Sequence, residues 1–125
     1  MIKGMEAVLL GSQNAKKLAE FYRVVVGLKQ RMVFEMGDKN EEGFDFDLGG
    51  TSLYIMSHSD VKGKSKTPAR IMFNLEVDDL EKEVARLKKS GVKPVAEIYH
   101  VEDYGYIATF ADVDGNYFQL VKTKE

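Results

Sequence analysis

The chain has 125 residues, of which 44% are hydrophobic, enough for one ordinary globular domain with a packed core. Its formal charge of −2 provides no basic surface for phosphate backbones, and its lack of cysteine excludes disulfides and thiolate metal sites. Because no apolar stretch is long enough for a membrane span or a signal peptide, we expect a cytoplasmic protein that binds neither membranes nor nucleic acid.

The first half of the chain has the pattern of a strand, a helix and three further strands. Residues 5–11 are largely apolar, and the polar residues 12–14 after them offer a helix cap. Apolar residues recur at helical spacing from there until Gly27. Alternating polar and apolar residues then predict strands over 29–36, 43–48 and 52–57. In the second of these strands, Asp45 and Asp47 indicate a solvent-facing side, although a cationic ligand could use these carboxylates.

The second half repeats this order after a polar connector. Residues 58–69 contain Gly and Pro and show no periodicity, which is typical of a linking segment. A strand follows from Arg70, and Asp78 with Glu81 predicts a capped helix start. Three more strands are expected at about 95–101, 105–111 and 116–122.

The two halves match each other at a constant offset, so that each residue in one half corresponds to the residue a fixed number of positions away in the other half. The segment ADVDGNYFQL at 111–120 has the plan of DLGGTSLYIM at 47–56, a Gly turn that leads into a strand. Gly115 corresponds to Gly50, and the same offset relates Gln119 to Tyr54. Residues 7–14 match 72–79 at this offset too. We therefore expect one domain made of two duplicated βαβββ units, 1–57 and 70–125, joined by the connector 58–69.

Three motifs and this tandem pattern resemble the vicinal oxygen chelate superfamily, which includes glyoxalase I, the bleomycin resistance proteins and the extradiol dioxygenases. The motifs are FYRVVVGLK at 21–29, VDDL at 77–80 and DVDGNYFQL at 112–120. The last is usually DPDGN followed by two residues and Glu, whereas here Val113 replaces the proline and Gln119 the glutamate. The resemblance implies an α+β fold, a curved mixed sheet with a concave cleft, and a homodimer. It leaves the function open, because the superfamily contains both enzymes and drug-binding proteins.

The resemblance also indicates which positions would hold a metal. The matching positions carry Ala7, Tyr54, Met72 and Gln119, of which only Gln119 offers a good oxygen ligand. We therefore predict no metal cofactor. In the alternative, the first strand shifts by one residue and turns Glu6 inward, so that Glu6 and Gln119 bind a divalent metal.

The predicted concave face has the mixture of apolar and polar side chains expected of a small-molecule site. Its expected lining is Leu9, Met32 or Phe34, Tyr54, Met56, Met72, Asn74, Tyr117 and Gln119. We expect Tyr54, Asn74 and Gln119 to contact a ligand, because such groups are costly to bury unpaired. The stretch YHVEDYGY adds His100 and Tyr104 as candidate ligand contacts. The apolar members could instead simply fill space or meet a second subunit.

The sequence supports three functional hypotheses. The first is a metal-free protein that binds an aromatic or cationic small molecule in the concave groove. The second is a lyase, isomerase or dioxygenase-related enzyme that uses a metal or an acid–base pair around His100, with Glu102 as another base and Tyr104 or Tyr106 as donor. The third is an interaction module. No residue is assigned a catalytic role.

Overall fold

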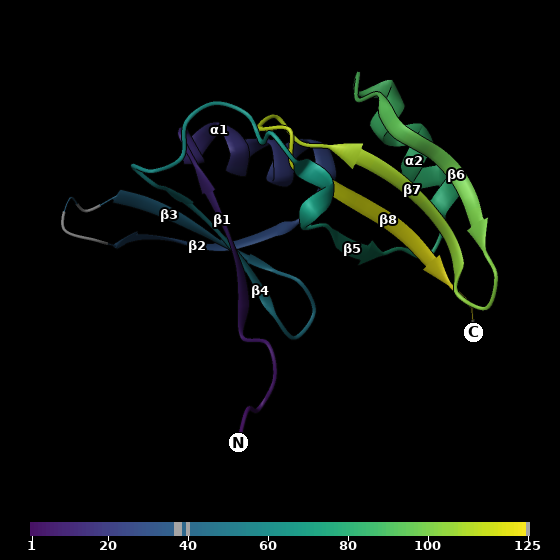
Figure 1. Cartoon of the computed structure of the whole chain (residues 1–125), viewed down its shortest axis with the longest axis horizontal. Coiled ribbons are helices and arrows are strands. Elements are labelled where there is room, and N and C mark those ends of the chain that lie inside the picture. The colour runs from purple at the N-terminus through teal and green to yellow at the C-terminus, as the bar shows by residue number, and fades with distance from the viewer. Residues whose placement is uncertain (37–38, 40, 125) are drawn as a thin grey trace. The chain divides into compact units, whose positions relative to one another are not determined.

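The computed structural model describes residues 1–36, 39 and 41–124, and the chain divides into two compact units, Met1–Gly63 and Lys64–Glu125 (Figure 1). Unit 1 contains β1 (Ala7–Ser12), α1 (Ala15–Glu20), the π-helix η1 (Phe21–Val26), β2 (Lys29–Met36), β3 (Glu41–Asp47) and β4 (Ser52–Ser57). Unit 2 contains the short 3₁₀-helix η2 (Pro68–Arg70), β5 (Phe73–Glu76), α2 (Leu80–Lys89), β6 (Pro94–Val101), β7 (Gly105–Ala111) and β8 (Tyr117–Thr123). These elements confirm the α+β fold class expected from the sequence.

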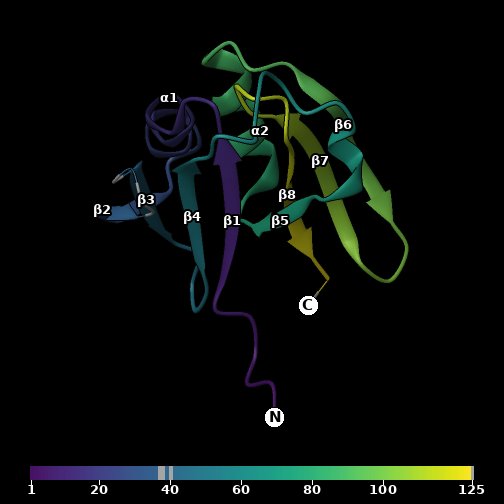
Figure 2. The same cartoon turned by 60° about the vertical axis from the view of Figure 1, so that its left-hand side comes forward.

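Each unit has one four-stranded mixed sheet, with strand order β1-β4-β3-β2 in unit 1 and β5-β8-β7-β6 in unit 2. The first strand runs parallel to the last, and the other pairs are antiparallel. Helix α1 contacts β1, β3 and β4 on one side of its sheet (Figure 2), and α2 contacts β7 and β8. We call the opposite side of each sheet its helix-free face. The last strand of each unit lies inside its sheet, where its side chains have neighbours on both sides.

In each sheet, the central residue of the last strand pairs with one residue of the first strand and one of the third. Tyr54 on β4 lies opposite Leu9 on β1 and Asp45 on β3. Gln119 on β8 lies opposite Asn74 on β5 and Thr109 on β7. Asn74 is the residue that corresponds to Leu9 at the constant offset, as expected. Thr109, in contrast, lies one position before the residue that corresponds to Asp45 at this offset. The equivalent central positions are thus occupied by a phenol in unit 1 and an amide in unit 2.

The core of unit 1 lies between α1 and its sheet. Asn14 caps α1 by accepting a hydrogen bond from the Lys17 backbone N–H at 3.2 Å. The helix continues as the π-helix η1 and ends at Gly27, whose φ of 93° favours glycine. The side chains that are fully buried in this unit include Leu18, Tyr22, Phe46, Leu53 and Ile55. Their burial fixes which face of each strand points away from the helix.

Helix α2 covers unit 2 in the same way, but its start differs from the prediction by one residue. Asp79, and not Asp78, is the cap, because its carboxylate accepts a hydrogen bond from the Lys82 backbone N–H at 3.1 Å. Leu87, Phe110 and Phe118 are fully buried in the core of this unit. No helix in the described part of the chain is both long and apolar enough to cross a bilayer.

The turn before β8 has the chemistry predicted for it. One carboxylate oxygen of Asp112 accepts hydrogen bonds from the backbone N–H groups of Asp114 and Asn116, at 2.9 and 3.0 Å. Gly115 has a φ of 81°, a conformation that suits glycine. The prediction that these polar residues form a turn is therefore confirmed.

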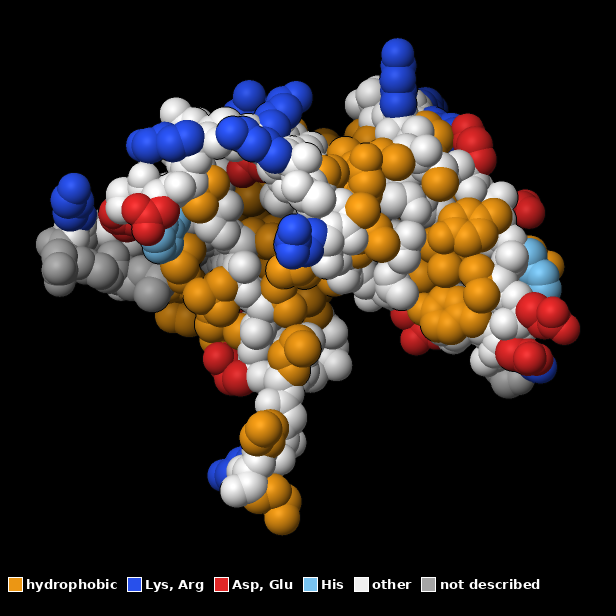
Figure 3. Space-filling view, viewed as in Figure 1, with side chains coloured by type: hydrophobic (Ala, Val, Ile, Leu, Met, Phe, Trp, Pro, Cys, Tyr) orange, Lys and Arg blue, Asp and Glu red, His pale blue; other side chains and the backbone are white. Residues whose placement is uncertain are grey.

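The first six residues precede β1, and the N-terminal part of this segment extends away from the sheet of unit 1 (Figures 1 and 3). Met1, Ile2 and Met5 are all exposed. The hydroxyl of Thr51 lies within hydrogen-bond distance of two backbone carbonyls, those of Met5 at 2.9 Å and Glu6 at 3.0 Å. These contacts anchor the end of the segment, so that the backbone of Glu6 is held beside the start of β4.

Candidate functional site

A hollow of about 480 Å³ lies on the helix-free face of unit 1. Its size is in the range typical of small-molecule sites. Its lining combines four apolar side chains with a phenol and two carboxylates: Glu6, Leu9, Met32, Phe34, Asp45, Tyr54 and Met56. Three of the candidate ligand contacts, Phe34, Tyr54 and Met56, are thus brought together in one place. We call this site the unit 1 hollow.

Two aromatic rings form one wall of the unit 1 hollow. The ring centroids of Phe34 and Tyr54 are 5.7 Å apart at an interplanar angle of 74°, a favourable edge-to-face arrangement. The Phe34 ring lies directly over Gly43 on the neighbouring strand, where a Cβ atom would stand only 2.5 Å from the ring. The lack of a side chain at Gly43 is therefore what allows the ring to lie against the sheet.

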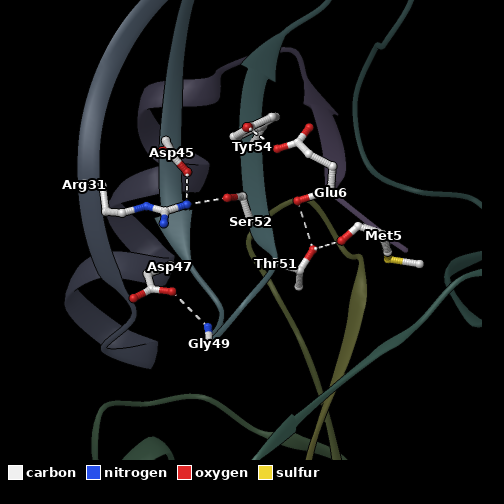
Figure 4. Close-up of polar contacts among 9 residues, drawn as sticks. All are labelled: Met5, Glu6, Arg31, Asp45, Asp47, Gly49, Thr51, Ser52 and Tyr54. Atoms are coloured by element: carbon white, nitrogen blue, oxygen red, sulfur yellow. Dashed lines mark hydrogen bonds and ion pairs between the residues drawn. The ribbon is translucent and has the colours of Figure 1, made fainter. Parts of the chain in front are cut away.

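Glu6 and Tyr54 form a polar pair at the edge of the hollow (Figure 4). The Tyr54 hydroxyl donates a hydrogen bond of 2.6 Å to a Glu6 carboxylate oxygen. This hydrogen bond, followed by desolvation and the Glu6 charge, raises the pKa of Tyr54.

Glu6 reaches the hollow without any shift of the β1 register. Leu9 pairs with Tyr54, so the expected face of β1 points into the hollow. Glu6 precedes β1 and is not bound by the alternation of the strand. The carboxylate considered in the alternative is therefore present in unit 1, but for a different structural reason.

Arg31 and Asp45 form an ion pair across β2 and β3, which the sequence analysis missed. An Arg31 guanidinium nitrogen lies 3.0 Å from an Asp45 carboxylate oxygen and also donates to the Ser52 hydroxyl (Figure 4). Asp45 is only 9% exposed, so the prediction that it lies on a solvent-facing side is wrong. Arg31 occupies an irregular position where the register shifts between Gln30 and Met32. A basic residue on the strand beside an acidic one was the only signal in the sequence.

Unit 2 carries a chain of side-chain hydrogen bonds at the equivalent position. The Thr109 hydroxyl donates to the Gln119 carbonyl oxygen at 2.7 Å, and the Gln119 amide donates to the Asn74 carbonyl oxygen at 2.8 Å. The Asn74 amide in turn donates to the Tyr104 hydroxyl at 2.9 Å. In both Asn74 and Gln119, the amide NH₂ donates a hydrogen bond and the carbonyl oxygen accepts one. These bonds join three candidate residues, Asn74, Tyr104 and Gln119.

The structure places His100 on the other face of the unit 2 sheet. His100 pairs with Tyr106, and their ring centroids are 4.8 Å apart. Tyr106 pairs with Lys122. Lys122 lies three positions after Gln119 on β8, so its side chain points to the opposite face of the sheet, the face that carries α2. A register shift between Ala96 and Tyr99 reverses the alternation of β6. His100 is therefore not brought together with Gln119.

Met72 stands just before β5 and is 42% exposed. The hydrogen-bond chain of unit 2 enters β5 at Asn74, and no described hydrogen bond involves the Met72 side chain. The structure thus does not bring Met72 together with either group of candidate residues by a described polar contact. Its thioether remains an apolar surface group of unit 2.

The donor set at the four positions matched to metal ligands does not fit a metal. Ala7 has no donor, and the thioether of Met72 is too soft for Mg²⁺, Mn²⁺ or Zn²⁺. The phenol of Tyr54 is protonated and bonded to Glu6, while the carbonyl oxygen of Gln119 already accepts from Thr109. In the residues that the structure describes, no three His, Asp or Glu side chains gather closely enough to hold an ion.

Comparisons with known proteins agree with this fold. A family model described as Glyoxalase/Bleomycin resistance protein/Dioxygenase superfamily matches residues 4–120. A comparison with curated proteins gave no match.

Similar solved structures share the architecture at low sequence identity. A glyoxylase/bleomycin resistance protein/dioxygenase domain from Frankia sp. EAN1pec is 18% identical, with a TM-score of 0.80 over 99% of this chain and 100% of that one. TnmS3, an antibiotic binding protein from Streptomyces sp. CB03234, is 21% identical, with a TM-score of 0.75 over 98% of both chains. FosX, a fosfomycin resistance protein from Listeria monocytogenes, is 21% identical, with a TM-score of 0.73 over 99% of this chain and 96% of that one. With the family model matched over residues 4–120, this chain belongs to the glyoxalase/bleomycin resistance protein/dioxygenase superfamily.

Proposed function

We propose that this protein binds a small organic molecule in the unit 1 hollow and that it does so without a metal. The observation that supports this most strongly is the lining of the hollow, where Leu9, Met32, Phe34 and Met56 surround a single phenol–carboxylate pair. Apolar walls bury the body of a ligand, and a few polar groups orient it. Binding by burial and hydrogen bonding is then the whole mechanism.

The metal-free part of the proposal rests on donor chemistry. Metal enzymes need several charged or imidazole ligands that converge on one point. Here the two matched positions with polar side chains, Tyr54 and Gln119, are committed to hydrogen bonds within the protein. Elemental analysis of protein purified without chelator tests this directly. A transition metal bound at one ion per chain would contradict the proposal.

A thermal-shift screen tests the binding activity. Two proteins of similar fold are an antibiotic binding protein and a fosfomycin resistance protein, so natural-product antibiotics belong in the compound set. A ligand present at one hundred times its dissociation constant should stabilise the fold by about 2.7 kcal/mol.

The site of binding is tested with a matched pair of variants on β2. Phe34→Ala removes one wall of the hollow and should abolish the shift. Val33→Ala changes the adjacent residue, which pairs with Phe44 on the other face of the sheet, and should leave the shift unchanged. If both variants keep the full thermal shift, the ligand binds elsewhere.

One observation favours a second candidate function, a metal-free lyase or isomerase. The Glu6 carboxylate and the Tyr54 hydroxyl are 2.6 Å apart at the edge of a hollow, which provides a base and a proton donor side by side. Incubation of each screening hit with the protein, followed by mass spectrometry or NMR of the compound, separates the two functions. A binding protein returns the compound unchanged, whereas an enzyme converts it.

We further propose that the protein acts as a homodimer in the cytoplasm. The dimer is what the family resemblance implies, and the location is the expectation drawn from a sequence that has no membrane-spanning apolar stretch and no cysteine. Sedimentation velocity tests the first part, because a monomer at micromolar concentration would contradict it. Cell fractionation tests the second.

A further inference from the structure

The lining of the unit 1 hollow carries more negative than positive charge. Two carboxylates, those of Glu6 and Asp45, line the hollow, and no Lys, Arg or His is among its described lining residues. Asp45 is neutralised from outside the hollow, because Arg31 lies 3.0 Å from its carboxylate. The charge that remains uncompensated is therefore that of Glu6.

Glu6 is an exposed residue whose carboxylate lines the hollow. Its side chain makes no ion pair with any other described residue, and one of its oxygens accepts the Tyr54 hydroxyl proton. Its backbone carbonyl is held by the Thr51 hydroxyl at 3.0 Å and by the Ser52 backbone N–H at 3.1 Å. A carboxylate that is held in position but lacks a cation can receive one from a ligand.

The remaining walls of the hollow suit a flat, polarisable group. The Phe34 and Tyr54 rings meet edge to face, so a third ring can stack on either. Met32 and Met56 add thioethers, which make favourable contacts with aromatic ring edges. The volume of about 480 Å³ accommodates a fused bicyclic ring with a short side chain.

We propose that the ligand of the unit 1 hollow is an organic cation with a flat aromatic body, whose ammonium group binds the Glu6 carboxylate while its ring packs between Phe34, Tyr54 and the two methionines. This inference rests on the proposed function and narrows it to one chemical class. Tyr54 orients Glu6 for this contact and does not itself need to touch the ammonium.

Three probes of the same shape and different charge test the proposal: naphthylmethylammonium, naphthylmethanol and naphthoate. Calorimetric titration of the full chain with each probe measures the affinity. We expect the cation to bind about tenfold tighter than the neutral alcohol, since a hydrogen bond to a charged group contributes about that factor. We expect the anion to bind most weakly of the three.

Two charge-neutralising variants complete the design. Glu6→Gln keeps the shape of the side chain, and it should reduce the affinity for the cation about tenfold while leaving that for the alcohol unchanged. Glu20→Gln is the matched control, because Glu20 is an exposed carboxylate on α1, which lies on the opposite face of the sheet. It should change neither affinity.

Each outcome bears on one of the two proposals. Equal affinities for the cation and the alcohol, or a Glu6→Gln variant that binds the cation normally, would overturn the charge preference and leave the binding function standing. If Phe34→Ala fails to weaken the probes that bind, the hollow itself is not the site. If none of the three probes binds, the aromatic-cation proposal is overturned, and the thermal-shift screen then decides the binding function separately.

Discussion

Replacing Gln119 with leucine should destabilise unit 2, because Gln119 holds the middle of a hydrogen-bond chain that is buried at its Thr109 end. Gln119 is 8% exposed and Thr109 is 6% exposed, and they are joined by a hydrogen bond of 2.7 Å. Gln119→Leu leaves the buried Thr109 hydroxyl without its acceptor, which costs about 1–3 kcal/mol. Asn74 is exposed and can bond to water instead, so the loss of its bond of 2.8 Å adds only about 0.5–1 kcal/mol. The added apolar burial offsets part of this loss, and we expect a net destabilisation of about 2 kcal/mol.

A double-mutant cycle with Thr109→Val isolates the pair. The double variant removes both the hydroxyl and its acceptor, so it should be more stable than the sum of the two single changes predicts, by about 1 kcal/mol or more. Urea unfolding followed by circular dichroism measures all four proteins. If Gln119→Leu costs less than about 0.5 kcal/mol and the cycle is additive, Gln119 is not held by this chain and is available for a ligand or a metal.

The remaining predictions concern the unit 1 hollow. Gly43→Ala should displace the Phe34 ring, since the new Cβ would stand 2.5 Å from it, and calorimetry should show weaker binding of the probes. If the Gly43→Ala change destabilises the protein through this clash, adding Phe34→Ala should remove that loss of stability. A Gly43→Ala protein that binds the probes normally would contradict the described wall. The phenol of Tyr54 should titrate above its ordinary pKa of about 10, because it donates a hydrogen bond to Glu6. The stabilisation from this hydrogen bond is therefore fully present below the ordinary pKa of a phenol, and it is lost as the pH rises through the raised pKa of Tyr54 in the folded protein. Ultraviolet titration against a Tyr54→Phe reference measures this, and Glu6→Gln should lower the pKa; a Tyr54 transition at or below the ordinary value would contradict the pairing.

Much of this fold can be predicted from the sequence, because the duplication constrains two halves at once. The constant offset of Tyr54 and Gln119 places both residues in equivalent central strands, and the structure confirms the equivalent neighbours Leu9 and Asn74 on the first strand of each unit. Alternation within β4 also identifies Tyr54 and Met56 as sharing one face, opposite the buried Leu53 and Ile55. Regular strands are predictable because their side chains alternate without exception.

The features that sequence reasoning missed lie where this regularity fails. The register shift between Ala96 and Tyr99 reverses the faces of β6, so His100 points to the side that carries α2. The irregular position of Arg31 brings its guanidinium onto Asp45, which alternation alone suggested was solvated. Glu6 reaches the hollow because it lies outside the strand. No residue type in these segments marks the irregularity, and the pairing partners that cause it are distant in sequence.

Amide NMR of the chelator-treated protein, titrated with naphthylmethylammonium, tests most directly whether a ligand binds the unit 1 hollow without a metal. We predict that the shifted signals lie around Glu6 and along β2, β3 and β4, and that adding Zn²⁺ or Mg²⁺ leaves both the pattern and the affinity unchanged. Binding that begins only after metal is added, or shifts confined to unit 2, would contradict this account.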